Sequence, residues 1–144
     1  ALPIYLVQSG VPVCGHLGLT PQSVNVLGGY KVQGKNDEQF QKILEDAKKL
    51  EAAGCFAIVL ECVPTELARQ ITNALKIPTI GIGAGNVTDA QVLVWQDLLG
   101  LNTEFKPKFV RKFANGADIF TNALNDFHNE VVNGTFPNES ESFK

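Results

Sequence analysis

Positive charge, cysteine and long apolar runs are all scarce in this sequence of 144 residues. The formal net charge is −3. The chain therefore lacks the excess of lysine and arginine that is typical of nucleic-acid-binding proteins, and we expect no nucleic-acid partner. No apolar stretch approaches the roughly 20 residues that a membrane-spanning helix needs, so we expect no membrane association. No charged and then apolar secretory signal opens the chain.

The three cysteines, Cys14, Cys55 and Cys62, include no CxxC pair. An odd number without metal-ligand spacing argues against a disulfide framework or a zinc site. It indicates a reducing compartment, so we expect a cytoplasmic protein. Each cysteine lies within an apolar run, where a thiol behaves as a small hydrophobic side chain. We therefore expect three buried and unreactive cysteines.

Short apolar runs alternate with amphipathic segments along the chain. Strands are predicted at 11–14 (followed by a turn at Gly15 and His16), 55–61 and 77–83, and helices at 36–54, 64–75 and 118–132. Residues 90–100 fit either a strand or a short helix, and the basic segment 106–112 fits a solvated helix face. Strands that are apolar on both faces and alternate with helices indicate a parallel sheet covered by helices, and hence an α/β fold.

Glu61 ends the apolar run 55–61, where a carboxylate is costly to bury. In a parallel α/β fold, the residues just past the carboxyl ends of the strands face the ligand site. A carboxylate in that position suits the removal of a proton from a weakly acidic C–H group. The alternative is a structural glutamate that caps the following helix or pairs with a lysine or arginine.

Two other predicted strands also end in unusual residues. His16 could donate a hydrogen bond to a substrate oxygen or carry a proton, or its ring could simply be satisfied by the backbone. The run "GIGAGN" at 81–86 fails the dinucleotide-binding pattern GxGxxG, because its third glycine is Gly85 and Asn86 takes the required position. The segment 17–37 is long for a loop between a strand and a helix, and long ordered loops at that end of a sheet are often lids or pocket walls. Disorder is the alternative, against which the apolar content of the loop argues.

Several blocks in a fixed order, "VPVCGHLGLTPQ", "LECVP", "IPTIGIGAGN" and "FKPKFVRKF", resemble the ketopantoate hydroxymethyltransferase family. The resemblance implies a (β/α)₈ TIM barrel and a cytoplasmic, Mg²⁺-dependent homo-oligomer, commonly a decamer. It implies hydroxymethyl transfer from 5,10-methylenetetrahydrofolate to the keto acid 3-methyl-2-oxobutanoate, which gives 2-dehydropantoate for pantothenate biosynthesis. In this family the glutamate of "LECVP", here Glu61, is the base that removes the C3 proton, and the histidine of "GHLGLTPQ", here His16, contacts substrate.

The length departs from the family pattern, because a complete barrel takes about 250 residues. We therefore interpret residues 1–144 as the C-terminal half of one barrel domain, with roughly strands five to eight and their helices. The metal ligands of the family lie in the other half, so none is expected in this chain. Three alternatives stay open: a short homologue that dimerises to close a barrel, a non-catalytic half-barrel for assembly or binding, and a barrel lyase for phosphorylated keto acids. The last would need a basic residue near "GIGAG", which the loop lacks.

Overall fold

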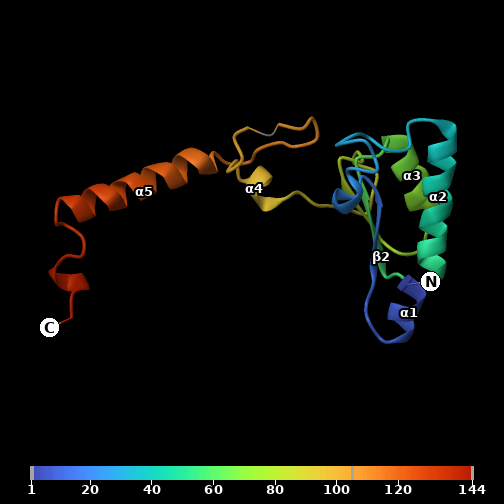
Figure 1. Ribbon diagram of the computed structural model, residues 1–144, viewed down its shortest axis with the longest axis horizontal. Helices are drawn as coiled ribbons and strands as arrows, with labels where there is room; N and C mark the ends of the chain where they lie inside the picture. The colour runs from blue at the N-terminus through green and yellow to red at the C-terminus, as the bar shows by residue number, and fades with distance from the viewer. Residues whose placement is uncertain (1, 105, 144) are drawn as a thin grey trace. The chain divides into compact units, whose positions relative to one another are not determined.

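A parallel sheet in the order β1–β2–β3–β4 forms the centre of the first part of the chain (Figure 1). The structure is a computed structural model that describes residues 2–104 and 106–143, and the chain divides into two units, 1–92 and 93–144. The first unit contains α1 (Leu2–Gln8), β1 (Cys14–Gly18), the 3₁₀ turn η1 (Pro21–Ser23), α2 (Asp37–Ala52), β2 (Ala57–Glu61), α3 (Thr65–Ala74), β3 (Thr79–Ile82) and β4 (Ala90–Gln91). The predicted α/β class is confirmed.

The first strand lies further along the chain than predicted. Residues 11–14 were expected to form it, yet β1 runs from Cys14 to Gly18, and His16 lies within it rather than in a turn. Pro12 has no N–H group to donate to a strand ladder, which disfavours pairing at the earlier position. Five consecutive residues of β1 instead pair with β2, from Cys14 opposite Ala57 to Gly18 opposite Glu61.

One face of this sheet packs against α2 and α3. Ile58 and Leu60 of β2 are fully buried there, together with Leu67 and Ile71 of α3. Each such side chain stabilises the fold by about 1.5–3 kcal/mol through burial. On the opposite face, the larger apolar side chains of β2 and β3 are only half-buried; they are Val59, Ile80 and Ile82. The prediction of a sheet covered by helices is therefore confirmed for one face.

Local sequence signals set the ends of α2 as predicted. The side chain of Asn36 accepts a hydrogen bond from the backbone N–H of Gln39 at 2.8 Å, which caps the start of the helix. After the helix, Gly54 takes the left-handed conformation with φ of +89°. A Cβ atom at Gly54 would lie 2.8 Å from Cγ1 of Val7 in α1, so the absence of a side chain lets α1 approach this end of α2.

A network of hydrogen bonds holds the start of β3 in place within the first unit. Thr79 is fully buried, and its backbone N–H and hydroxyl donate to Oδ2 of Asp89 at 2.8 and 2.9 Å. The hydroxyl of Thr72 in α3 lies 2.8 Å from that of Thr79. The backbone N–H of Thr79, and then its hydroxyl, hold the pKa of the Asp89 carboxyl below its ordinary value.

This network predicts an acid-dependent contribution of Asp89 to stability. A carboxyl whose folded pKa lies below the unfolded value of about 3.9 stabilises the fold fully above that pH, and the stabilisation is lost as the pH falls through the folded pKa. In urea unfolding, the difference between wild type and Asp89→Asn is expected to stay constant from neutral pH to about pH 5, then shrink below about pH 4. A difference that grows on acidification would contradict the prediction.

The second unit contains α4 (Trp95–Leu98), α5 (Gly116–Val132) and the 3₁₀ turn η2 (Glu139–Glu141). The ambiguous segment 90–100 holds both a strand, β4, and a helix, α4. The prediction of a helix face for 106–112 is wrong, because these residues form a turn at 108–109 and otherwise lie outside any helix or strand. The following backbone is tied to α4 instead: the N–H of Phe113 donates to the carbonyl of Leu98 at 2.8 Å.

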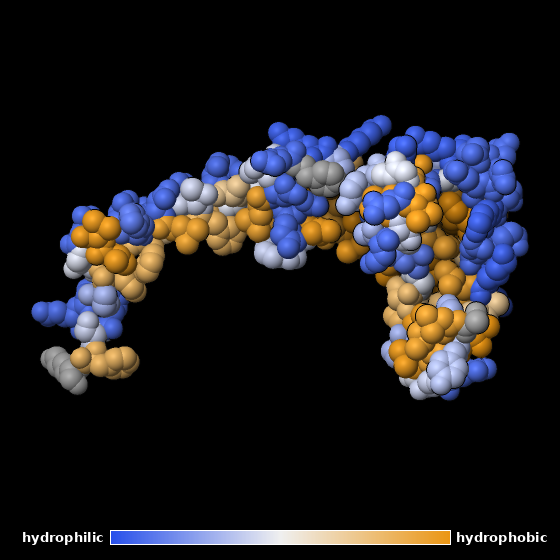
Figure 2. All heavy atoms as spheres, viewed as in Figure 1, coloured by the Kyte–Doolittle hydropathy of each residue, from blue (hydrophilic) through white to orange (hydrophobic). Residues whose placement is uncertain are grey.

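The helix α5 is amphipathic and carries an exposed apolar stripe. Phe120, Leu124, Phe127 and Val131 follow one another at helical spacings of four, three and four residues, and all are exposed. Figure 2 shows hydrophobic side chains along one side of α5 and hydrophilic ones along the other. The helix begins two residues earlier than predicted, and His128 is exposed on it as expected.

Candidate functional site

The carboxyl ends of β1, β2 and β3 lie side by side, and Glu61 is at the middle of them. As the last residue of β2, Glu61 pairs with Gly18 on one side and with Ile82 on the other. Its carbonyl accepts a hydrogen bond from the N–H of Leu19 at 2.8 Å. The backbone that carries the Glu61 carboxylate is therefore held by both neighbouring strands.

His16 and Glu61 form a direct pair on the half-buried face of the sheet. Nε2 of His16 lies 3.0 Å from Oε2 of Glu61, and their side chains are 35% and 16% exposed. His16 stands opposite Val59, two residues before Glu61 along β2, so both side chains project from the same face. The two residues that were predicted separately at neighbouring strand ends are thus in contact.

This contact bears on the structural alternatives for Glu61. The helix α3 begins after Pro64 and has no side-chain hydrogen bond at its cap, so Glu61 does not cap it. The partner of the carboxylate is an imidazole rather than a lysine or arginine. An imidazole can donate its Nε2–H to a carboxylate and can also exchange a proton with it, which suits acid–base chemistry.

The glycine loop after β3 adjoins Glu61 through the backbone. The N–H of Cys62 donates to the carbonyl of Ile82 at 2.9 Å, and the loop turns at Gly83 and Gly85, with φ of +64° and +79°. A Cβ atom at Gly85 would lie 2.5 Å from Oγ1 of Thr65, the first residue of α3. The glycines therefore allow a tight turn that rests on this helix.

Two cavities lie beside β1, and His16 borders both. One of about 330 Å³ is lined by His16, Leu17, Gly18, Thr20, Leu27, Gln33, Gly34, Gln39, Lys42, Ile43 and Asp46. Four residues of the long loop after β1 form one wall of it, as predicted from the length of the loop; they are Thr20, Leu27, Gln33 and Gly34. Glu61 is not among the residues that line either of these two cavities.

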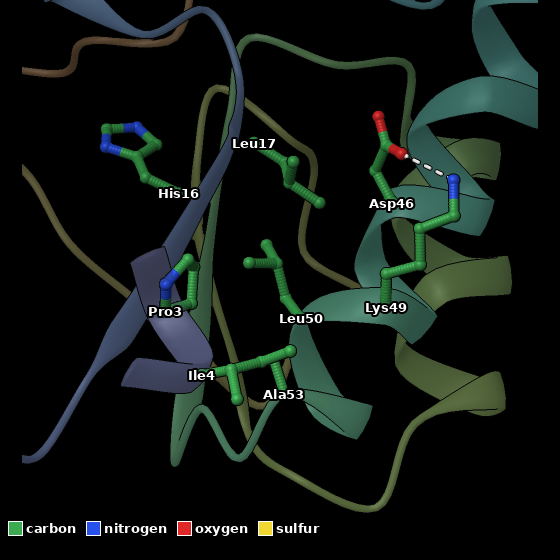
Figure 3. A pocket seen from close by; sticks show the side chains of 8 residues that line it. All are labelled: Pro3, Ile4, His16, Leu17, Asp46, Lys49, Leu50 and Ala53. Carbon is green, nitrogen blue, oxygen red and sulfur yellow. Dashed lines mark hydrogen bonds and ion pairs between the residues drawn. The ribbon is translucent and has the colours of Figure 1, made fainter. Parts of the chain in front are cut away.

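The second cavity, of about 400 Å³, lies between α1, β1 and α2. Figure 3 shows the His16 ring on the side of β1 away from Leu17 and Leu50. Asp46 lies at the edge of this cavity, and a hydrogen bond from Lys42 is the main reason that the pKa of its carboxyl is lowered. The cavity has a largely apolar lining with a charged margin on α2.

The cysteines differ from the prediction in one case. Cys55 and Cys62 are buried, and burial raises the pKa of both thiols, as expected for unreactive core side chains. Cys14 is exposed, because it projects from β1 on the face that α2 and α3 do not cover. No sequence signal identified the left-handed backbone of Cys62, whose φ is +49°.

The residues present do not form a magnesium site by themselves. Across residues 2–104 and 106–143, no three His, Cys, Asp or Glu side chains are grouped so as to hold a metal ion. Mg²⁺ demands near-octahedral coordination by oxygen atoms, and the paired strand ends offer one carboxylate, which is bonded to His16.

A helix must be both long and apolar to span a membrane. None of the helices in the described ranges, 2–104 and 106–143, meets both requirements.

Comparisons with known proteins identify one matching family and several relatives that share one name. Residues 4–139 match the family described as ketopantoate hydroxymethyltransferase. The chain is 59% identical over 139 residues to a 3-methyl-2-oxobutanoate hydroxymethyltransferase of Legionella pneumophila, which covers 96% of this chain and 53% of that protein. A protein of the same name from Bdellovibrio bacteriovorus is 60% identical over 139 residues, which are 96% of this chain and 53% of that protein. Another from Coxiella burnetii is 59% identical over 133 residues, which are 92% of this chain and 50% of that protein. The chain thus spans about half the length of the curated relatives it matches.

Proposed function

Since the chain belongs to the ketopantoate hydroxymethyltransferase family, we propose that it forms the C-terminal half of a 3-methyl-2-oxobutanoate hydroxymethyltransferase. The protein would transfer a hydroxymethyl group from 5,10-methylenetetrahydrofolate to 3-methyl-2-oxobutanoate and produce 2-dehydropantoate for pantothenate biosynthesis. The observation that carries this proposal is the Glu61–His16 pair, in which Oε2 and Nε2 lie 3.0 Å apart at adjoining strand ends.

In this proposal Glu61 is the base that removes the C3 proton of the keto acid. The carboxylate is partly exposed on the open face of the sheet, so a small molecule can reach it. The bonded backbone on both sides of Glu61 fixes its position, and a well-placed base contributes about 10²- to 10⁴-fold to such a step. The electron pair left at C3 then forms the new carbon–carbon bond with an acceptor of the formaldehyde oxidation level: water breaks the carbon–nitrogen bonds between the methylene carbon and folate, which releases tetrahydrofolate, and its oxygen becomes the hydroxyl of the new hydroxymethyl group.

His16 is proposed to contact substrate and to orient the base. His16 is a lining residue of both cavities beside β1. Its ring lies on the open face of the sheet, where it reaches Glu61 (Figure 3). A ring in this position can hold one carboxylate oxygen by hydrogen bonding and can present its remaining edge to a bound keto acid. The His16 contact therefore supports a role in the same chemistry as Glu61.

The (β/α)₈ barrel is the fold that we propose for the whole protein, with β1 to β4 as strands five to eight. The half-buried face that holds Val59, Ile80 and Ile82 supports this arrangement, since it resembles the inner face of a barrel that lacks its other strands. Mg²⁺ is proposed as the metal of the complete protein, with its ligands outside these 144 residues.

A cytoplasmic homo-oligomer, on the scale of a decamer, is also proposed. The apolar stripe on α5 supports assembly, because four large apolar side chains exposed along one helix favour contact with another protein surface. Native mass spectrometry of the protein would measure the number of subunits directly.

The proposed function can be tested by proton exchange at C3 of 3-methyl-2-oxobutanoate in D₂O, followed by ¹H NMR. We expect the protein expressed from the complete coding sequence of its source to catalyse loss of the C3 signal, and EDTA to slow this loss at least about tenfold. The 144-residue chain alone is expected to give no exchange above background. Absence of exchange with the complete protein would instead favour a non-catalytic half-barrel.

A further inference from the structure

The backbone of Cys62, directly after Glu61, has an uncommon conformation. Its φ of +49° is the one positive value among the non-glycine residues that the structure describes. Side chains other than glycine, asparagine and aspartate rarely adopt this left-handed region, and residues branched at Cβ are true outliers there. Such residues persist where the surrounding structure enforces them, and they concentrate at functional sites.

Hydrogen bonds hold the peptide groups around Cys62 in place. Its N–H donates to the carbonyl of Ile82 in β3, and its carbonyl accepts from the N–H of Gln33 in the long loop, both at 2.9 Å. The preceding carbonyl, of Glu61, accepts from Leu19 at 2.8 Å. The turn therefore connects two segments, the end of β3 and the loop after β1, whose Gln33 contributes to the wall of the smaller cavity.

Packing enforces the same turn. The left-handed residue breaks the alternation of β2, so that Cys62 and Val63 are both buried, at 8% and 3% exposure. Glu61, which precedes them, keeps its side chain on the open face. If residue 62 took an extended conformation, Val63 would be turned away from the core and the bond to Gln33 would be lost.

The thiol itself is a poor candidate for chemistry. Burial, and then the neighbouring Glu61 carboxylate, raise the pKa of the Cys62 thiol, so the group stays protonated at neutral pH. A protonated, buried thiol is neither a nucleophile nor a metal ligand. We therefore look for a functional role in the left-handed backbone conformation of Cys62 rather than in its thiol.

We propose that Cys62 is a positioning residue, whose enforced left-handed turn fixes the direction of the Glu61 carboxylate toward His16. The inference rests on the proposed role of Glu61 as the base. A side chain that resists the left-handed region would shift the peptide between residues 61 and 62, and with it the carboxylate. The distance of 3.0 Å between Nε2 of His16 and Oε2 of Glu61 would then change.

The test compares Cys62→Thr with Cys62→Ser, because these two side chains share a hydroxyl and differ by one methyl group that branches Cβ. In the complete protein, we expect kcat for C3 proton exchange to be at least about tenfold lower in Cys62→Thr than in Cys62→Ser, with KM for the keto acid within about threefold. Glycine accepts the left-handed region freely, so Cys62→Gly is expected to match Cys62→Ser in kcat and to melt at the same or a higher temperature.

The matched control is Cys55→Thr against Cys55→Ser, at a buried cysteine without a positive φ, where branching is expected to leave kcat unaffected. Equal kcat values for Cys62→Thr and Cys62→Ser would overturn the proposal. A folded Cys62→Gly with kcat at least about tenfold below that of Cys62→Ser would also overturn it, and this second comparison decides the matter if Cys62→Thr does not fold.

The role of Cys62 and the proposed function fail in different ways. If the wild-type protein exchanges no C3 proton, the proposed function fails, and the position of the pair is then read from the ring-proton NMR shifts of His16. We expect these shifts to move in Cys62→Thr and to move much less in Cys62→Ser. Unchanged His16 shifts in a folded Cys62→Thr would contradict the positioning role whatever the reaction is.

Discussion

Glu61→Gln is expected to lower the rate of C3 proton exchange by about 10²- to 10⁴-fold, because glutamine keeps the size and a hydrogen-bond acceptor but cannot take a proton. The His16 ring can still donate to the amide oxygen, so the strand ends are expected to keep their arrangement. The loss should therefore appear in kcat, while KM for the keto acid changes little. Deuterium incorporation followed by ¹H NMR measures both quantities.

Glu66→Gln is the matched control for this substitution. Glu66 is exposed in the first turn of α3, five residues from Glu61, and its side chain contacts its own helix neighbours Arg69 and Gln70. We expect the exchange rate of Glu66→Gln to stay within about twofold of wild type. Exposed side-chain pairs on a helix contribute only about 0.3–0.5 kcal/mol to the stability of the fold, so their loss should leave the site in place. A Glu61→Gln variant that exchanges as fast as Glu66→Gln would show that another group is the base.

Gly18→Ala is expected to destabilise the fold by about 3 kcal/mol, which is large for the addition of one methyl group. Gly18 ends β1 with φ of +89°. A Cβ atom there would lie 2.6 Å from Cγ1 of Val63 and would overlap the carbonyl oxygen of Glu61. That oxygen accepts the hydrogen bond from Leu19, so the new methyl group would separate β1 from β2 at the site.

Gly10→Ala separates the two causes of this loss. Gly10 has a similar φ of +80°, but a Cβ atom there would have no neighbour within 4 Å. Its substitution is expected to cost only the conformational term, about 1 kcal/mol. Urea unfolding of both variants gives the two free-energy changes, and their difference measures the steric conflict with Glu61 and Val63. Equal changes would show that the strand ends can move apart without cost.

The sequence allowed the elements with strong local signals to be predicted. The helix α2 has a cap at Asn36, a regular apolar face and a terminal Gly54, and each acts within a few residues of the chain. The strand β1 was misplaced because its sequence, CGHLG, has two glycines and little strand preference of its own. Its pairing with β2, about 43 residues further along, decides its position, as Cys14 opposite Ala57 shows.

The candidate site was predicted in part for the same reason. Glu61 and His16 could be placed at one edge of a parallel sheet, because the carboxyl ends of parallel strands meet there. Their direct contact depends on the register of β1 against β2, which no local pattern encodes. The left-handed turn at Cys62 likewise comes from contacts with Gln33 and Ile82, which are distant in sequence. The exposure of Cys14 depends on which sheet face the helices cover.

The half-buried face of the sheet links the energetics of folding to those of the site. Val59, Ile80 and Ile82 share this face with the His16–Glu61 pair. Any part of the protein that covers it would remove apolar side chains from water and lower the dielectric constant around the pair. Electrostatic attraction at a fixed distance rises severalfold as the effective dielectric falls from that of water to about 20. Closure of this face would thus strengthen the attraction between Glu61 and a protonated His16, even with no movement of either side chain.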